Sequence, residues 1–171
     1  SQEGYVIRYD LDAGTRRMIR PAADDPKVPL RFNWNAAIAQ DPFDPATIYF
    51  GSQFVHQSRD RGETWTTISP DLTRNDPKRQ DQAKNGGLTP DVTGAENNTT
   101  LVAIEPSPLE QGVLWAGSDD GRLHLSRDGG AQWSSLEGRL KGAPGDGYLA
   151  HIHASQHAAG RAFVVIDNHR N

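Results

Sequence analysis

The chain has 171 residues, a formal net charge of -4, a hydrophobic fraction of 35% and no cysteine. The lack of cysteine excludes disulfides, cysteine zinc sites and thiol nucleophiles, and the weakly acidic balance lacks the basic surface typical of proteins that bind nucleic acid or anionic membranes. No run of about 18 apolar residues occurs, so no membrane insertion is predicted.

The first predicted element is a hairpin at the start of the chain. Strands near residues 4–10 and 16–19 flank Asp12-Ala13-Gly14, whose residue types favour a tight turn. Short runs of β-branched and aromatic residues between Gly, Pro, Asn and Asp clusters continue along the whole sequence, and helical periodicity is almost absent. The sequence therefore predicts an all-β protein in which residues 4–20 form half of a four-stranded unit.

Two complete four-stranded units and a second half unit are predicted further along the chain. The first complete unit occupies residues 35–68, with strands near 35–40, 47–51, 54–58 and 65–68. The second occupies residues 100–137, with strands near 100–105, 113–117, 122–126 and 132–136. The last half unit occupies residues 150–167, with strands near 151–154 and 162–166. Residues 69–98 form a long polar connection, which we interpret as an ordered loop on a ligand or partner side.

A short motif, Ser-x-Asp-x-Gly-x-x-Trp, occurs twice, 68 residues apart. The aspartate can accept hydrogen bonds from turn amides, the glycine allows a positive φ, and the tryptophan begins the last strand and buries its ring between units. We therefore expect these residues to be structural. The residues of the two motifs are Ser58, Asp60, Gly62, Trp65, Ser126, Asp128, Gly130 and Trp133.

The motif resembles the Asp box of the bacterial neuraminidase repeat. Its flanks, at residues 68–76, 113–121 and 163–170, are similar to those of large exported bacterial repeat proteins related to sortilin-type ectodomains and xyloglucanase-type glycosidases. The resemblance implies one partial β-propeller domain over residues 1–171, with two complete blades and a half blade at each end, and an exported protein, periplasmic or extracellular. It does not imply one function, because such repeats serve hydrolases, receptors and assembly factors.

The two half units are complementary. The chain opens with a third and fourth strand and closes with a first and second strand, and such halves join into one composite blade in closed propellers. Closure within one chain would give only three blades, too few for the usual ring. We therefore expect remaining blades or a second copy of the chain to complete it.

The candidate catalytic residues are Asp119, Asp120 and Glu96. They belong to the second-to-third turns and blade-to-blade loops, which line the usual ligand face of a propeller. The resemblance to xyloglucanase-type enzymes around Ser118-Asp119-Asp120-Gly121 implies an acid there, and glycoside hydrolysis uses paired carboxylates. The alternative interpretation is that Asp-Asp-Gly forms an ordinary hairpin turn.

Two other kinds of site are weakly supported. A sialidase would need three arginines around a substrate carboxylate, and we interpret Arg31, Arg74, Arg122 and Arg139 as solvated or paired surface residues instead. His151-x-His153 could place two rings on one strand face for a metal, but a third ligand is missing. The sequence thus predicts no metal and no cofactor.

Three functional hypotheses remain open. The first is a non-catalytic scaffold or recognition module that binds a protein or glycan through its loop face. The second is a fragment of a glycoside hydrolase, with Asp119 as its acid or base. The third is a repeat fragment that self-associates to complete a propeller ring. Nucleic acid is not an expected partner in any of them.

Overall fold

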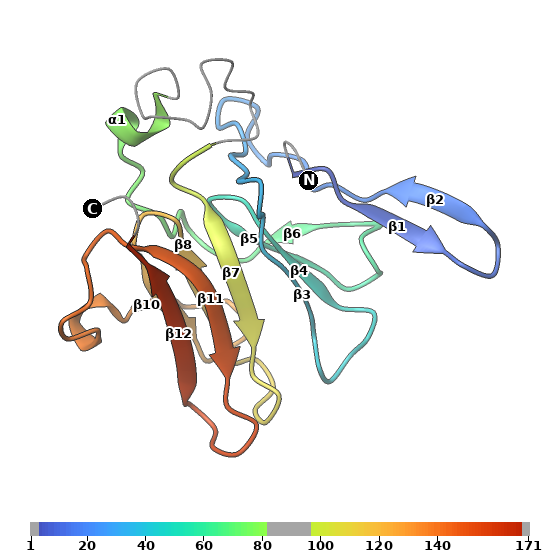
Figure 1. The fold of residues 1–171 in the computed structure, drawn as a ribbon. Coiled ribbons are helices and arrows are strands. Elements are labelled where there is room, and N and C mark those ends of the chain that lie inside the picture. Colours follow the sequence, from blue (N-terminus) through green and yellow to red (C-terminus); the bar gives the residue numbers. More distant parts are fainter. Residues whose placement is uncertain (1–3, 82–96, 169–171) are drawn as a thin grey trace.

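A computed structural model describes residues 4–81 and 97–168 of the chain. The regular structure of the described residues is almost entirely β, and it includes the short helix α1 (Pro77–Gln80) and a 3-10 turn at Glu137–Arg139 (Figure 1). The strands are β1 (Ile7–Asp10), β2 (Thr15–Met18), β3 (Ile38–Gln40), β4 (Ile48–Gly51), β5 (Val55–Ser58), β6 (Thr66–Thr67), β7 (Leu101–Pro106), β8 (Leu114–Ser118), β9 (Leu123–Ser126), β10 (Ser134–Ser135), β11 (Tyr148–Ala154) and β12 (Ala162–Asp167).

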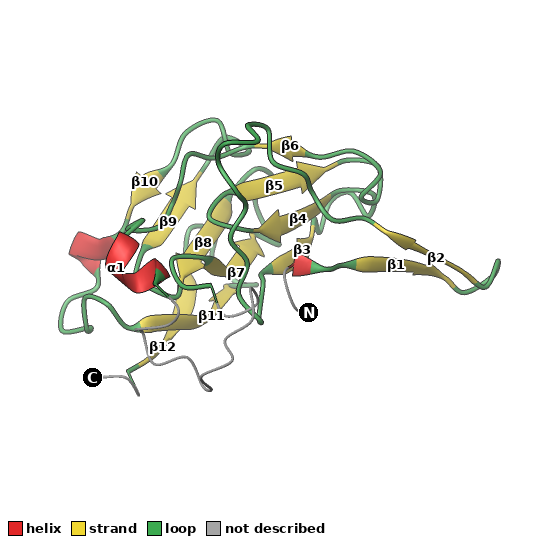
Figure 2. Ribbon diagram, turned by 90° about the horizontal axis from the view of Figure 1, so that it is seen from above, coloured by secondary structure: helices red, strands yellow, loops and turns green. Residues whose placement is uncertain are grey.

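These strands form two four-stranded antiparallel sheets and two hairpins. The sheets have the orders β3-β4-β5-β6 and β7-β8-β9-β10, and the hairpins are β1-β2 and β11-β12. The β1-β2 hairpin extends away from the other strands, and β11-β12 lies beside β7 at the other side of the molecule (Figures 1 and 2). This arrangement confirms the predicted fold class, two complete propeller blades with a half blade at each end.

Strand pairing shows which place each hairpin takes in a blade. The first two strands of each complete blade and the two strands of the last hairpin pair in the same register, and the corresponding pairs are Ile38 with Phe50, Ile104 with Ala116, and Ile152 with Val164. Hairpin β11-β12 therefore consists of a first and a second strand.

The hairpin β1-β2 takes the other two places. A backbone amide just after the fourth strand bonds a carbonyl at the start of the third strand, and the corresponding bonds are Ile68 to Val55, Leu136 to Leu123, and Ile19 to Val6. The N-terminal hairpin therefore consists of a third and a fourth strand.

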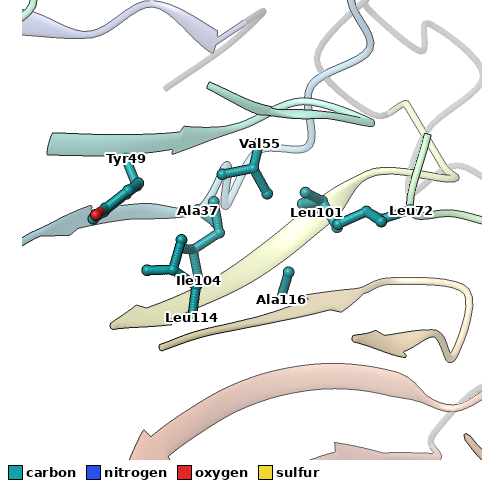
Figure 3. Packing of buried hydrophobic residues seen from close by; sticks show 8 residues of the cluster. All are labelled: Ala37, Tyr49, Val55, Leu72, Leu101, Ile104, Leu114 and Ala116. Atoms are coloured by element: carbon teal, nitrogen blue, oxygen red, sulfur yellow. The ribbon is translucent and has the colours of Figure 1, made fainter. Parts of the chain in front are cut away.

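The hydrophobic core lies between neighbouring blades. One cluster joins the two complete blades and consists of Ala37, Tyr49, Val55, Leu72, Leu101, Ile104, Leu114 and Ala116 (Figure 3). A second joins β7–β10 to the last hairpin and consists of Ala103, Val113, Trp115, Leu123, Leu149, Ile152 and Ala154. Burying each large apolar side chain contributes about 1.5–3 kcal/mol, so these contacts fix blade against blade.

Regular structure in the connections differs from the expectation. The sequence predicted no helix, yet α1 forms within the 69–98 connection because Asp76 accepts a hydrogen bond from the Lys78 amide at 2.9 Å and Pro77 occupies the first helical position. The last strand of each complete blade is only two residues long and begins after the motif tryptophan. No helix of the described residues is long and apolar enough to cross a membrane.

Candidate functional site

The turns between second and third strands meet the blade-to-blade connections on one face, here called the loop face. It consists of Ser52-Gln53, Ser118–Gly121 and the described parts of connections 20–37 and 69–100. Main-chain bonds hold it together: Leu72 N donates to Gln53 O at 3.1 Å, and Asp119 N to Thr100 O at 3.0 Å. Because strands alternate in direction, the turns between third and fourth strands lie at the opposite end of each blade.

Asp119 is buried within the loop face. Its side chain is 4% exposed, and its Oδ1 accepts a hydrogen bond from Thr100 N at 2.9 Å. Its Oδ2 accepts from Thr100 Oγ1 at 2.8 Å and from Asn33 Nδ2 at 3.1 Å. Burial raises the pKa of Asp119 to about 6, although the bonds from Thr100 and Asn33 act in the opposite direction. The carboxylate thereby connects Thr100, just before the first strand of its own blade, to the 20–37 connection.

Asp120 is also buried and holds the 69–98 connection. Ser118 Oγ donates to its Oδ1 at 2.5 Å, and the Arg74 amide donates to its Oδ2 at 2.8 Å. Arg74 Nε donates in addition to the Asp120 carbonyl at 2.8 Å. Burial raises the pKa of Asp120, while the bonds from Ser118 and Arg74 act to lower it. Both oxygens of this carboxylate are therefore engaged by the chain itself.

The first complete blade has an uncharged counterpart of this anchor. Gln53 lies in its second-to-third turn, where its Oε1 accepts from Arg31 N at 2.9 Å and its Nε2 donates to Pro29 O at 3.0 Å. Gln53 thus fixes the 20–37 connection as Asp120 fixes the later one. Since an amide serves in one blade, the position does not need a negative charge for this role.

Three of the arginines considered above form ion pairs. Arg31 lies 2.8 Å from Asp71, whereas Arg74 and Arg122 both pair with Glu137. Arg31 is also fixed by Nε donating to a backbone carbonyl at 3.1 Å. Arg31 and Arg74 therefore cross-link neighbouring connections, and the three guanidinium groups together do not surround one anion site.

The two Ser-x-Asp-x-Gly-x-x-Trp turns share one set of hydrogen bonds. In the first, Asp60 Oδ1 accepts from Ser58 Oγ at 2.8 Å and from Thr64 N at 2.9 Å, and Gly62 N donates to Ser58 Oγ at 2.7 Å. The Thr64 hydroxyl also bonds Asp60, and these bonds lower the pKa of Asp60 to about 2.

The second turn repeats this arrangement. Asp128 Oδ1 accepts from Ser126 Oγ and from Gln132 N, both at 2.9 Å, and Gly130 N donates to Ser126 Oγ at 2.9 Å. The Gln132 amide is the largest cause of a lowered Asp128 pKa. Both aspartates are thus held as turn acceptors.

The tryptophans of these turns bind the preceding blade. Trp65 Nε1 donates to Ile19 O at 2.6 Å, and Trp133 Nε1 donates to Ile68 O at 2.9 Å. Gly130 has a φ of 98°, and a Cβ there would lie 2.7 Å from Ile68 Cδ1. A side chain at this position would therefore collide with the preceding blade.

The other residues considered above are Glu96 and the two histidines. Glu96 lies outside the described residues. His151 and His153 are exposed and stacked, with ring centroids 6.4 Å apart. Within residues 4–81 and 97–168, no three metal-ligating side chains gather.

Sequence reasoning missed Asn33, Thr100 and the exposed Trp34. Asn33 binds Asp119 from 86 residues away, a contact for which no local pattern exists. Trp34 is 48% exposed on the connection that leads into β3, and only its residue type could have drawn notice.

Comparisons with known proteins identify the fold. No family model and no curated protein sequence matches the chain. Among solved structures, the GH74 enzyme of Niastella koreensis superposes with a TM-score of 0.55 and 17% identity over 97% of this chain. The GH74 xyloglucanase of Xanthomonas campestris has a TM-score of 0.44 and 18% identity over 68% of this chain, and YCF48 bound to a D1 peptide has 0.43 and 16% over 83%.

These likenesses concern architecture. The chain spans 24% of the Niastella protein, 16% of the Xanthomonas protein and 35% of YCF48. At such identities, only the fold carries over, and that fold is a β-propeller.

Proposed function

We propose that the chain is a non-catalytic β-propeller segment that recognises a protein or glycan through its loop face. The supporting observation is the state of Asp119 and Asp120. Every carboxylate oxygen of the two accepts a hydrogen bond from the chain, and their exposed fractions are 4% and 0%. A general acid or base has to reach the reacting atoms at hydrogen-bond distance. Both groups instead fix the connections around them.

A glycoside hydrolase is the second candidate, and one observation favours it. Burial raises the pKa of Asp119 to about 6, a value that suits a general acid near neutral pH. The same burial separates its oxygens from solvent, and the corresponding turn of the first complete blade, which contains Gln53, carries no acid. The recognition role therefore has the better support.

Trp34 is the proposed contact residue. It is half-exposed and follows Asn33, whose amide Asp119 holds at 3.1 Å. Asp119 would thus position the segment that presents the indole. An exposed indole offers an apolar face to a sugar ring or to a pocket of a protein partner.

The test combines binding and hydrolysis on one panel of soluble β-glucans that includes xyloglucan. We expect at least one glycan to retard the wild-type protein in affinity electrophoresis, Trp34→Ala to lose the retardation, and no reducing ends to appear. If no glycan retards the protein, the proposal of a glycan ligand is wrong, and a protein is the proposed ligand of the loop face. Hydrolysis by the wild type that Asp119→Asn abolishes, with the variant folded by circular dichroism, would overturn the proposal.

A further inference from the structure

The last hairpin exposes an aromatic side chain whose counterparts are buried. Strand pairing places Phe163 opposite His153, at the position that Tyr49 and Trp115 take in the complete blades. Tyr49 is 2% exposed and Trp115 is 3% exposed, because the next blade covers each of them. Phe163 is 68% exposed. The face of β11-β12 that would meet a following blade is therefore open.

The first complete blade is open in the complementary way. Ile38 on β3 is 55% exposed, whereas its counterparts Ile104 and Ile152 are 6% and 1% exposed. Ile104 shares a cluster with Tyr49, and Ile152 shares the other cluster with Trp115. Phe163 and Ile38 are thus the two separated halves of a third contact of the same kind.

We propose that two copies of this chain associate and complete each other's half blades, β11-β12 of one copy pairing with β1-β2 of the other. The twelve strands of the described residues make the equivalent of three blades, so two copies would make six, within the usual range for a closed ring. The exchange is mutual and has twofold symmetry, which closes the assembly. Phe163 of each copy would then cover Ile38 of the other.

The edges that would pair are available. Among the described residues, β12 pairs only with β11, and β1 only with β2. On β1, Ile7 and Tyr9 are 54% and 59% exposed, and the hairpin extends away from the other blades (Figure 2). An exposed edge that carries apolar side chains is a template for another strand.

The repeat also fixes the register of this pairing. Val55 and Leu123 begin the third strands of the complete blades, and they pair with Gly51 and Gly117 of the second strands. In the first hairpin Val6 takes the place of Val55. The Val6 carbonyl accepts a hydrogen bond from the amide after the fourth strand, as the Val55 carbonyl does in the first complete blade.

The corresponding residue of the second strand is Val165. It pairs with His151, as Gly117 pairs with Ala103. Val165 of one copy should therefore lie opposite Val6 of the other.

Light scattering after size exclusion tests the association. We expect the wild-type chain to have twice its mass of 18.7 kDa, and Phe163→Ser to shift it to the mass of one chain. Phe43→Ser is the matched control, because Phe43 is 47% exposed and its counterpart Leu109 is still 45% exposed in the second complete blade, which has a neighbour on each side. The control variant should keep the double mass.

Disulfide trapping tests the register, on a chain without cysteine of its own. Val6→Cys with Val165→Cys should give a covalent dimer under mild oxidation, since directly opposed residues lie within disulfide reach. In the pair Tyr9→Cys with Val165→Cys, the first cysteine lies three residues, about 10 Å, beyond position 6 along the strand, so this pair should give little covalent dimer. A wild-type chain of single mass, a dimer that Phe163→Ser leaves intact, or equal trapping by both pairs would overturn the proposal. The mass of one chain would mean that a second copy of this chain does not complete the half blades and that other blades do.

Discussion

Two Ser-x-Asp turns at opposite ends of neighbouring blades have opposite electrostatics. Ser58 donates to Asp60 at 2.8 Å in one turn, and Ser118 donates to Asp120 at 2.5 Å in the other, so the local contact is the same. Yet the pKa of Asp60 is lowered to about 2, whereas the pKa of Asp120 is raised. The difference comes from burial, because the loop-face acids lie under the connections between blades and the other acids lie at the surface.

This contrast teaches that a turn motif does not set the role of its acid. At the surface, turn amides and hydroxyls favour the charged carboxylate and lock the turn. Beneath the connections, a similar group loses solvent and holds two distant segments together. A carboxyl with a raised pKa can thus be a structural anchor, although raised values also mark catalytic acids.

The largest expected effect is at Asp119. Asp119→Ala leaves Thr100 N, Thr100 Oγ1 and Asn33 Nδ2 without their acceptor, so we expect a loss of about 4 kcal/mol in the free energy of unfolding. Asp128→Ala, on the exposed turn, should cost clearly less. Urea unfolding followed by circular dichroism measures both, and equal losses would remove the contrast between the faces.

The pH dependence of stability should also separate the faces. The folded pKa of Asp119, about 6, lies above its ordinary value of 3.8, so the native state binds more protons between these values. Its contribution to the free energy of unfolding therefore falls by about 3 kcal/mol as pH rises from 4 to 6, then stays level.

Asp119→Asn should abolish this fall. The comparison has to be wild type minus variant, because burial lowers the pKa of His56 to about 4 and its contribution is lost as pH falls from about 6.5 to 4. Urea unfolding at several pH values gives the difference. Parallel curves for wild type and variant would contradict a raised pKa at Asp119.

The contact between blades at the motif turns can be tested with neighbouring glycines. Gly130→Ala places a Cβ 2.7 Å from Ile68 Cδ1 at a φ of 98°, so we expect a loss of about 2 kcal/mol. Gly129→Ala has a φ of 70° and nothing within 4 Å, and should cost about 1 kcal/mol from backbone strain alone. Indistinguishable thermal unfolding of the two variants would argue against close packing there.

The smallest expected effect concerns Asp60 and the dependence of stability on pH in acid. Its folded pKa of about 2 lies below the ordinary value, so it contributes stability above about pH 4 that is lost as pH falls toward 2. Asp60→Asn should lack this loss, and stability at low pH should depend less on pH. Acid titration by circular dichroism compares the two proteins, and an unchanged acid limb would show that Asp60 does not titrate low.

The repeat made most of the fold predictable. Strand positions and the complementary half units followed from the spacing of Trp65 and Trp133 and from their flanks, because each blade reuses one local pattern. Helix α1 was missed, although Asp76-Pro77 is a helix-start signal, because a four-residue helix carries no periodicity.

The site was less predictable than the fold. Residues Asp119 and Asp120 were chosen from a local turn, but their burial depends on Asn33 and Arg74, which lie 86 and 46 residues away along the chain. No spacing rule links such positions. Only the packing of one connection over the next turn determines that these carboxylates face inward.

The most direct test is titration of the aspartate side chains by carbon NMR in a single sample. The contrast between faces predicts a midpoint near 6 for Asp119 and near 2 for Asp60. A midpoint for Asp119 at or below the ordinary value of 3.8, alongside Asp60, would contradict it, because burial would then not dominate the electrostatics of the loop-face carboxylate.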